Sequence, residues 1–155
     1  LNSGTTNTIL SQELVNLNKR ITVVTNNYAA INILLQSENI HLIAVGGEID
    51  SLERSAYGTV CEKEFSQYFP DIAFLSINAV NYSDGFTDFR FHEFGVIQLL
   101  ARTAKRVIAV MDSGKLGKCS KKKVLSRNQV ERVIMDGSIS EEIRKKYEEK
   151  GIIIS

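Results

Sequence analysis

The chain has 155 residues, of which 43% are hydrophobic and 24% are charged, and it contains two cysteines. This composition is typical of a globular protein and excludes a disordered chain or a low-complexity fibre. Two cysteines outside any CxxC pair exclude a disulfide scaffold and favour a reducing compartment. No apolar run reaches the roughly 18 residues of a membrane span, and the first ten residues lack the pattern of a signal peptide. We expect one domain over residues 1–155, in the cytoplasm, with no membrane partner.

The net charge of +1 is the difference between two oppositely charged parts of the chain. Residues 1–100 carry five basic and eleven acidic residues, a net −6, whereas residues 101–155 carry fourteen and seven, a net +7. Nine basic residues lie between Arg102 and Arg127, opposed only by Asp112. The near-neutral total excludes a general polyanion binder. The local excess fits either a solvated lysine-rich loop or a positively charged functional surface.

Short apolar, β-branched runs alternate along the chain with segments of helical periodicity. These runs are continuous, which is typical of strands buried on both faces of a parallel sheet. In chain order the pattern predicts a helix at Thr8–Leu17, a strand at Ile21–Val24, a helix at Tyr28–Leu35, strands at Leu42–Val45 and Ile72–Ile77, a helix at Phe91–Ala104, strands at Val107–Met111 and Val133–Met135, a helix at Ser140–Lys150 and a strand at Ile152–Ile154. This alternation predicts the α/β class, as a three-layer sandwich with a mainly parallel sheet.

The sequence also predicts an apolar stripe on the first helix, a cap on the last helix and an incomplete first strand. In the first helix the period places Ile9 and Leu17, with two leucines between them, on one apolar stripe. Ser140 precedes two glutamates and predicts an N-terminal helix cap. The segment Ser3–Thr6 resembles a strand-to-helix turn, yet only two residues precede it. Because strands need several residues, we expect the first strand to begin before Leu1.

Polar residues cluster where the predicted strands end. In a parallel α/β sheet, ligands bind beyond the carboxyl ends of the strands. Glycine lets the backbone approach a ligand, helix amides hold an anion, and lysine neutralises a phosphate. The candidate effector-binding residues are Ser3, Gly4, Thr5 and Thr6; Thr25, Asn26 and Asn27; Gly46, Gly47 and Glu48; Asp84, Gly85 and Thr87; and Asp112, Ser113 and Lys115. Each group alone also fits a helix cap or a turn. Together they favour a small, hydroxylated, anionic ligand such as a sugar phosphate.

Other motifs of catalysis and cofactor binding are absent from the sequence. Neither GxGxxG nor GxxxxGK[ST] occurs, which excludes the common dinucleotide and Walker fingerprints. His41 and His92 lack metal-ligand spacing, and no base pattern accompanies Cys61 or Cys119. We expect no cofactor, no metal site and no cysteine nucleophile.

Several motifs follow one another along the chain: SGTT, TVVTNN, AVGGEI, YG, PDIAFLSINAV with DGFT, AVMDSGKLGK and RVIMDG. In order and spacing, from Ser3 to about Gly137, they resemble the effector-binding domain of DeoR-type transcriptional repressors. The resemblance implies a fold similar to ribose-5-phosphate isomerase (the NagB-like fold) and a phosphorylated sugar or related metabolite as effector. It also implies an N-terminal winged helix-turn-helix that binds operator DNA. Residues 1–155 contain no such segment, so we expect them to be the sensor part of a longer repressor.

The resemblance assigns the effector site to the loops named above and adds Glu93, the acidic residue that opens the following helix. Three positions depart from the family pattern. Asn2 stands where the family usually has Asp, Ile97 where it has Lys, and Gly114 where it has a small hydroxyl residue. If a lysine at position 97 contacts the ligand, its loss predicts anion binding weaker by about 1–3 kcal/mol or a different ligand.

Three functions follow from these observations. The first is a sensor domain without turnover, in which effector binding shifts the equilibrium between domain or oligomer arrangements. The second is an aldose–ketose isomerase, with Asp84 or Asp112 as base and Lys115 as electrophile. The third is direct nucleic-acid binding, which is disfavoured because no aromatic residue lies between Arg102 and Arg127. We also expect a homo-oligomer, with the segment Ile49–Phe69 as the candidate contact.

Overall fold

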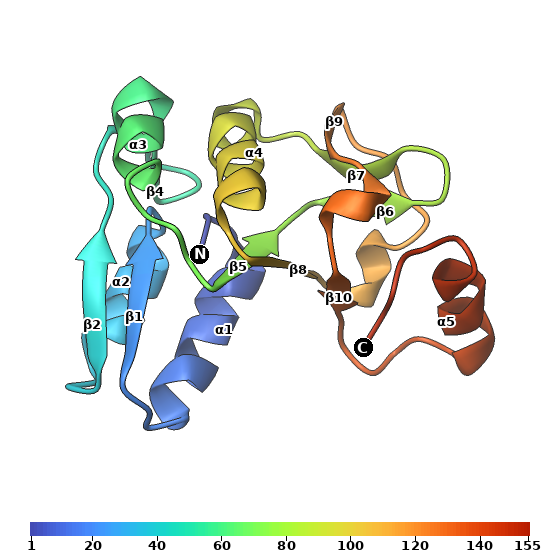
Figure 1. The fold of residues 1–155 in the computed structure, drawn as a ribbon, viewed down its shortest axis with the longest axis horizontal. Helices are drawn as coiled ribbons and strands as arrows, with labels where there is room; N and C mark the ends of the chain where they lie inside the picture. The colour runs from blue at the N-terminus through green and yellow to red at the C-terminus, as the bar shows by residue number, and fades with distance from the viewer.

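Parallel strands form the centre of the molecule in the computed structural model, which describes residues 1–155 (Figure 1). One section of sheet pairs β1 (Ile21–Thr25) with β2 (Ile40–Ala44). The other has the order β10-β8-β5, with β5 at Ile72–Ser76, β8 at Arg106–Val110 and β10 at Arg132–Ile134. All pairs in both sections are parallel, so the predicted α/β fold with a parallel sheet is confirmed.

The first two residues lie between the two sections of sheet (Figure 1). The Leu1 amino group donates to Val24 O of β1 at 2.8 Å. The Asn2 side chain takes the place of a strand partner for β5, because its Oδ1 accepts from Ser76 N at 2.8 Å and its Nδ2 donates to Ser76 O at 3.0 Å. These bonds tie the two sections together.

Five helices accompany the sheet: α1 (Thr5–Asn16), α2 (Tyr28–Leu34), α3 (Gly58–Phe65), α4 (Phe94–Thr103, after a 3₁₀ turn at Phe91–Glu93) and α5 (Glu141–Glu148). Helix α1 packs beside α2, and α3 packs beside α4. Neighbouring side chains of a strand point to opposite faces, and in β1 these are Val23 and Val24. Val23 belongs to the apolar cluster under α1 and α2, whereas Val24 packs against the larger cluster that includes α3 and α4. The helix pairs therefore cover opposite faces of β1. None of the helices has the length and apolar character needed to cross a bilayer.

The prediction for helix α1 is wrong in two respects. The helix begins three residues earlier than predicted, and two residues of its predicted apolar stripe are exposed, Ile9 to 63% and Leu17 to 55%. Its buried residues are instead Asn7 and Ser11. The physical reason is a hydrogen-bonding requirement, since Asn7 Nδ2 donates at 3.0 Å to Phe74 O at the neighbouring strand.

Antiparallel pairs that the sequence did not predict extend the fold. A hairpin joins β3 (Glu48–Asp50) to β4 (Ser55–Tyr57), and a small sheet has the order β6-β7-β9, with β6 at Ala79–Asn81, β7 at Gly85–Asp88 and β9 at Lys122–Leu125. Residues 78–87, in which the sequence pattern predicted no strand, therefore contain β6 and most of β7. Val80 and Phe86, both fully buried, pair across this hairpin and anchor it in the core.

The C-terminal segment packs against the small sheet through an aromatic pair. Tyr147 of α5 is buried, and its ring centroid lies 4.2 Å from that of Tyr82 in the β6–β7 turn. The predicted cap of this helix is confirmed, because Ser140 Oγ accepts from Ile143 N at 3.4 Å. The predicted last strand is reduced to a parallel bridge between Ile154 and Val133.

Gly47 and Gly46 provide a matched test of the β3–β4 hairpin. Gly47 has a φ of 149°, and a Cβ there would lie 2.5 Å from Tyr57 O and 2.9 Å from Cys61 Cβ. We expect Gly47→Ala to lower the free energy of unfolding by about 1–3 kcal/mol, measured by urea unfolding. Gly46→Ala is the control, since a Cβ there has no neighbour within 4 Å. Equal stability of the two variants would contradict this account of the hairpin.

Candidate functional site

Helix α1 begins directly after Gly4, within the loop Ser3–Thr6 that the sequence predicts to bind an anion. Gly4 has a φ of 124°, in the region that favours glycine. A Cβ here would overlap Ser76 Oγ at the end of β5 and lie 3.0 Å from Arg90 Nη1. No side chain caps the helix, so the amides of its first turn have no side-chain acceptor. The positive end of the helix dipole and these donors are thus suited to an anion.

Glu93 is a buried carboxylate next to this loop, with an exposed fraction of 1%. Its Oε2 accepts from Ser3 N at 3.2 Å and from Asn2 Nδ2 at 3.4 Å. Its Oε1 accepts from Asn26 Nδ2 at 3.0 Å and from Ser55 Oγ at 3.4 Å. Each oxygen accepts two hydrogen bonds, and the donors come from the beginning of the chain, the end of β1 and strand β4. Glu93 therefore holds three distant segments in one arrangement.

Arg90 uses all five of its N–H donors within the domain. Nε and Nη2 bind the two oxygens of Asp88 at 3.0 and 2.7 Å, and Nη2 also donates to Ser76 O at 2.8 Å. Nη1 donates to Ser3 O at 3.1 Å and to Ser3 Oγ at 3.2 Å. The side chain is only 8% exposed. Arg90 therefore fixes the first loop against the end of β5 and has no donor left for a ligand.

The pKa values of both buried charges reflect these contacts. Burial raises the pKa of the Glu93 carboxyl, whereas the charge of Arg90 and the hydrogen bonds from Ser3 and Asn26 lower it in part. Burial acts to lower the pKa of Arg90, but the hydrogen bonds and charge of Asp88 outweigh this effect and raise it. The guanidinium therefore stays charged, and it offsets part of the cost of burying Glu93.

The loop after β1 connects helix α2 to the hydrogen-bonded cluster formed by Ser3, Arg90, Glu93 and their partners. Asn27 caps α2, because its Oδ1 accepts from Ala30 N at 3.1 Å. Its Nδ2 donates to Gly4 O at 3.3 Å, and Thr25 Oγ1 accepts from the Asn27 amide at 3.1 Å. The predicted first and second loops are thus directly hydrogen-bonded to each other.

Two buried acceptors in the cluster lack a donor. Asn26 Nδ2 donates to Ala56 O at 2.7 Å as well as to Glu93, which determines the orientation of the amide. Asn26 Oδ1 then has no partner, although the residue is fully buried, and the same holds for Asn7 Oδ1. A buried acceptor without a donor costs about 1–3 kcal/mol, so each of these two atoms calls for an explanation.

The loop after β2 lies apart from this hydrogen-bonded cluster. Gly46 N donates to Glu64 Oε2 at 3.3 Å, and Gly47 packs against α3. Glu48 is exposed on β3, where its Oε1 would be 2.8 Å from a Cβ at Gly58. Backbone packing explains Gly47, whereas a Cβ at Gly46 would have no neighbour within 4 Å. No hydrogen bond links Glu48 to Glu93.

The remaining predicted residues divide between two other places. Asp84 and Gly85 line a separate polar cavity beside β9, and buried Thr87 accepts from Ser120 N at 2.8 Å through its Oγ1. In the loop after β8, Lys115 Nζ lies 3.3 Å from Asp112 Oδ2, and Ser113 N donates to Asp136 at 2.8 Å. No hydrogen bond or ion pair joins either group to the Ser3–Thr6 loop. Direct hydrogen bonds thus link only the first two predicted loops and Glu93.

The two cysteines are both free and differ in their surroundings. Cys61 is buried, and burial followed by the charges of Glu93 and two other glutamates raises the pKa of its thiol to about 12. Cys119 is exposed and unpaired. No group of three or more His, Cys, Asp or Glu side chains is arranged to hold a metal ion.

Residues 1–137 match the family model of the DeoR C terminal sensor domain. The chain belongs to this family. It is 28% identical over 139 residues to the putative aga operon transcriptional repressor of Escherichia coli O157:H7, covering 90% of this chain and 51% of the relative. It is 27% identical to the HTH-type transcriptional regulator GolR of Listeria innocua, covering 98% and 59%, and 26% identical to the glycerol-3-phosphate regulon repressor of Escherichia coli K12, covering 86% and 52%. The chain thus spans about half the length of these relatives.

A solved structure supports the fold of this DeoR sensor domain. Ribose 5-phosphate isomerase A from Methanocaldococcus jannaschii superimposes with a TM-score of 0.51 and 17% sequence identity, covering 75% of this chain and 44% of the isomerase. The predicted similarity to the isomerase fold is therefore confirmed. At this identity the likeness concerns the fold alone.

The three departures from the DeoR pattern have different surroundings. Ile97 is fully buried in the apolar core on α4. Asn2 is also fully buried, and its Nδ2 donates to Ser76 and Glu93, which an aspartate could not do. Gly114 is exposed in the loop after β8. Asn2 therefore has a structural role that depends on the amide.

Sequence reasoning missed several residues of the DeoR site: Asn7, Ser55, Ser76, Asp88 and Arg90. Asp88 and Arg90 are two residues apart, and this opposite-charge pair at the end of an alternating segment is the one local signal. Ser3, which accepts from Arg90, is 87 residues away from it. No local pattern reports a contact over that distance.

Arg90→Lys tests the requirement for five donors. A lysine retains the charge but has three donors, so acceptors at Ser3 and Ser76 would lose partners. We expect the free energy of unfolding to fall by about 1–3 kcal/mol, measured by urea unfolding. The control Arg102→Lys changes an exposed arginine and should stay within about 0.5 kcal/mol of the wild type. An Arg90→Lys variant as stable as this control would contradict the role given to Arg90.

Glu93 predicts a pH dependence of stability. Because its pKa is raised on folding, the folded state binds this proton more tightly than the unfolded chain does. Its contribution to stability is complete below the unfolded pKa of about 4.3 and is lost as pH rises through the folded pKa. We measure the free energy of unfolding by urea at a series of pH values. In Glu93→Gln we expect no fall in this free energy over the pH range in which Glu93 titrates. Glu13→Gln, on the exposed face of α1, should show the same fall as the wild type. If stability fell with pH by the same amount in Glu93→Gln as in the wild type, the fall would belong to another titrating group.

Proposed function

We propose that this domain binds a phosphorylated sugar or a related metabolite at the Ser3–Thr6 loop and responds without chemical turnover. Its relatives are named as transcriptional regulators, and one is a glycerol-3-phosphate regulon repressor. These names support a regulatory role in sugar metabolism. The choice of a phosphorylated ligand rests on the chemistry of the site.

The start of α1 is the observation that carries the proposal. Its first-turn amides lack a side-chain cap, and Gly4 lets the preceding loop pack closely against Ser76 and Arg90. A phosphate group supplies two negative charges and several acceptors, which suit these donors and the helix dipole. Asn26 Oδ1, buried without a donor, is the acceptor that we assign to a hydroxyl group of the effector.

The same geometry favours sensing over isomerisation. An isomerase needs a carboxylate that is free to take a proton from the substrate. Glu93 is the one carboxylate bonded to the first loop, and both of its oxygens already accept two hydrogen bonds. Asp84 and Asp112, the alternative bases, have no hydrogen bond to that loop.

A bound effector would act by stabilising one arrangement of the segments that meet at Glu93. A ligand shifts an equilibrium by its difference in affinity for the two states. We propose that the shift reaches operator DNA through a DNA-binding part outside residues 1–155, and that the domain acts as a homo-oligomer. Ile49, Leu52, Val60 and Phe69 are exposed in the segment Ile49–Phe69, as a contact between copies would require. The effector roles of the other predicted loop residues stay predictions.

Thr5→Asp tests the proposed anion site. An aspartate in the first turn of α1 favours the helix dipole but repels a phosphate bound there. We therefore expect unchanged or higher stability of the free protein and about tenfold weaker binding, or about 1.4 kcal/mol. Asn16→Asp adds the same charge at the opposite end of α1, about 16.5 Å away, and should bind as the wild type does. Equal binding by the two variants would place the anion elsewhere.

To identify the effector, the Tm of the protein is measured with ribose 5-phosphate, glycerol 3-phosphate and other phosphorylated sugars. Each compound is compared with its unphosphorylated form. A ligand at one hundred times its Kd stabilises the folded state by about 2.7 kcal/mol, which raises Tm by roughly 5–11 °C for a domain of this size. Conversion of ribose 5-phosphate to a ketose would contradict sensing without turnover.

A further inference from the structure

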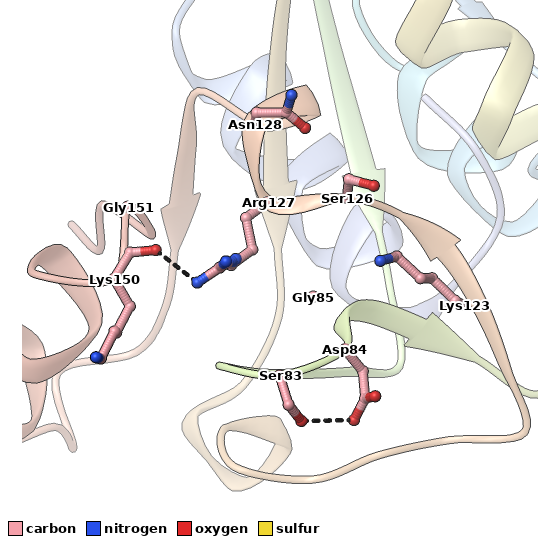
Figure 2. Close-up of a pocket in the computed structure, with 9 residues that line it drawn as sticks. All are labelled: Ser83, Asp84, Gly85, Lys123, Ser126, Arg127, Asn128, Lys150 and Gly151. Atoms are coloured by element: carbon pink, nitrogen blue, oxygen red, sulfur yellow. Dashed lines mark hydrogen bonds between the residues drawn. The ribbon is translucent and has the colours of Figure 1, made fainter.

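A second polar cavity lies away from the Ser3–Thr6 loop, between the small sheet and the C-terminal segment. It has a volume of about 390 Å³, and none of its nine lining residues is hydrophobic. The lining comes from the β6–β7 turn, strand β9, the 3₁₀ turn at Arg127–Gln129 and the residues after α5 (Figure 2). Its size is within the range of about 300–1,000 Å³ found for ligand clefts, but such clefts are mostly apolar. The lining therefore excludes an apolar ligand and favours a hydrophilic one.

Three basic residues line this cavity, Lys123, Arg127 and Lys150, and Asp84 is its one acidic residue. None of the three basic side chains forms an ion pair. Hydrogen bonds from Asn81 and Ser83 lower the pKa of Asp84, so this carboxylate is charged near neutral pH. The lining thus carries a net charge of +2, which matches the −1.5 to −2 charge of a phosphate monoester.

Arg127 has unused hydrogen-bond donors, whereas Arg90 has none. The Arg127 side chain donates through Nη1 to Lys150 O at 3.0 Å and makes no other hydrogen bond, so four of its five side-chain donors are unused (Figure 2). A guanidinium with free donors can bind two oxygens of one phosphate group at once. Arg90, by contrast, has no donor left.

The cavity is held in shape by the backbone around Arg127. Ser126 and Gln129 form a reciprocal capping box across the 3₁₀ turn, with Ser126 N donating to Gln129 Oε1 at 2.8 Å. Gly85 has a φ of 79°, and a Cβ there would lie 2.9 Å from Leu125 O. The glycine therefore lets β7 approach the end of β9, and this approach brings Asp84 to the same cavity as Arg127.

We propose that this cavity is a second binding site for a small phosphorylated ligand, with Arg127 and Lys123 holding the phosphate. Lys150 at the rim adds to the positive field, and Asp84 with Ser83 offers partners for hydroxyl groups. Lys150 and Gly151 lie beyond residue 137, where the match to the family model ends. A ligand here would connect the C-terminal segment to β9 and the β6–β7 turn.

A small ligand fits the cavity better than a nucleic acid does. No aromatic residue lines the cavity, whereas single-stranded nucleic acids are bound by stacking on aromatic side chains. Duplex DNA is bound along an extended row of phosphates, whereas the three basic residues here lie around a single cavity.

The test is a titration of the ¹⁵N-labelled 155-residue chain with inorganic phosphate and with ribose 5-phosphate, at constant ionic strength, observed by amide NMR. We expect saturable shifts of the Gly85 and Gly151 amides, and tighter binding of ribose 5-phosphate than of inorganic phosphate. Arg127→Gln and Lys123→Gln should each weaken the binding at least tenfold. The matched controls Arg102→Gln and Lys121→Gln remove the same charges at exposed positions outside the cavity and should leave it unchanged. The dispersion of the spectra reports whether each variant is folded.

The outcomes separate this proposal from the effector site at α1. Shifts at Gly85 and Gly151 that survive Thr5→Asp but not Arg127→Gln support the second site. It would be overturned by the absence of saturable shifts at these two glycines, or by equal weakening in the control variants, which would indicate a diffuse positive field. It would also be overturned if duplex DNA, but not phosphate, shifted these two signals.

Discussion

The burial of one carboxylate, Glu93, is the constraint on which the candidate site depends. Removing a charge from water is costly unless hydrogen bonds and an opposite charge replace the solvent. Glu93 receives four hydrogen bonds, from donors 38 to 91 residues away in the sequence, and the charge of Arg90 acts in the same direction. The beginning of the chain, the end of β1 and strand β4 are therefore held around one point. A change in any of these segments would alter the hydrogen bonds of the others, which is a useful property for a sensor.

The two arginines beside predicted site residues show how the same residue type serves two purposes. Arg90 is buried and uses every donor to position Ser3, Ser76 and Asp88. Arg127 lines an open polar cavity and uses one donor. The number of unused donors, rather than the presence of a positive charge, distinguishes a positioning residue from one available to a ligand.

Membership of the DeoR sensor family and the likeness to an isomerase fold fit together physically. This chain places polar loops at the carboxyl ends of parallel strands, where an α/β sheet offers helix N-termini and space for a ligand. In this chain the carboxylate at that edge is saturated with hydrogen bonds, and the position where its family usually has a lysine, Ile97, is part of the apolar core. The fold is thus retained while the groups nearest the first loop bind the protein itself.

The sequence by itself determined the parallel strands, helices α2, α4 and α5 and the loops at the ends of the parallel strands, because these depend on local periodicity and capping. It also indicated that the first two loops carry polar groups suited to an anion. The antiparallel hairpins escaped prediction because strands of three or four residues have too few side chains to show an alternation. Only the tertiary structure decided that Asn7 and Ser11, rather than Ile9 and Leu17, face the interior, and that Asp84 belongs to a second cavity. Those outcomes depend on which buried polar groups need a partner, and the partners lie far away along the chain.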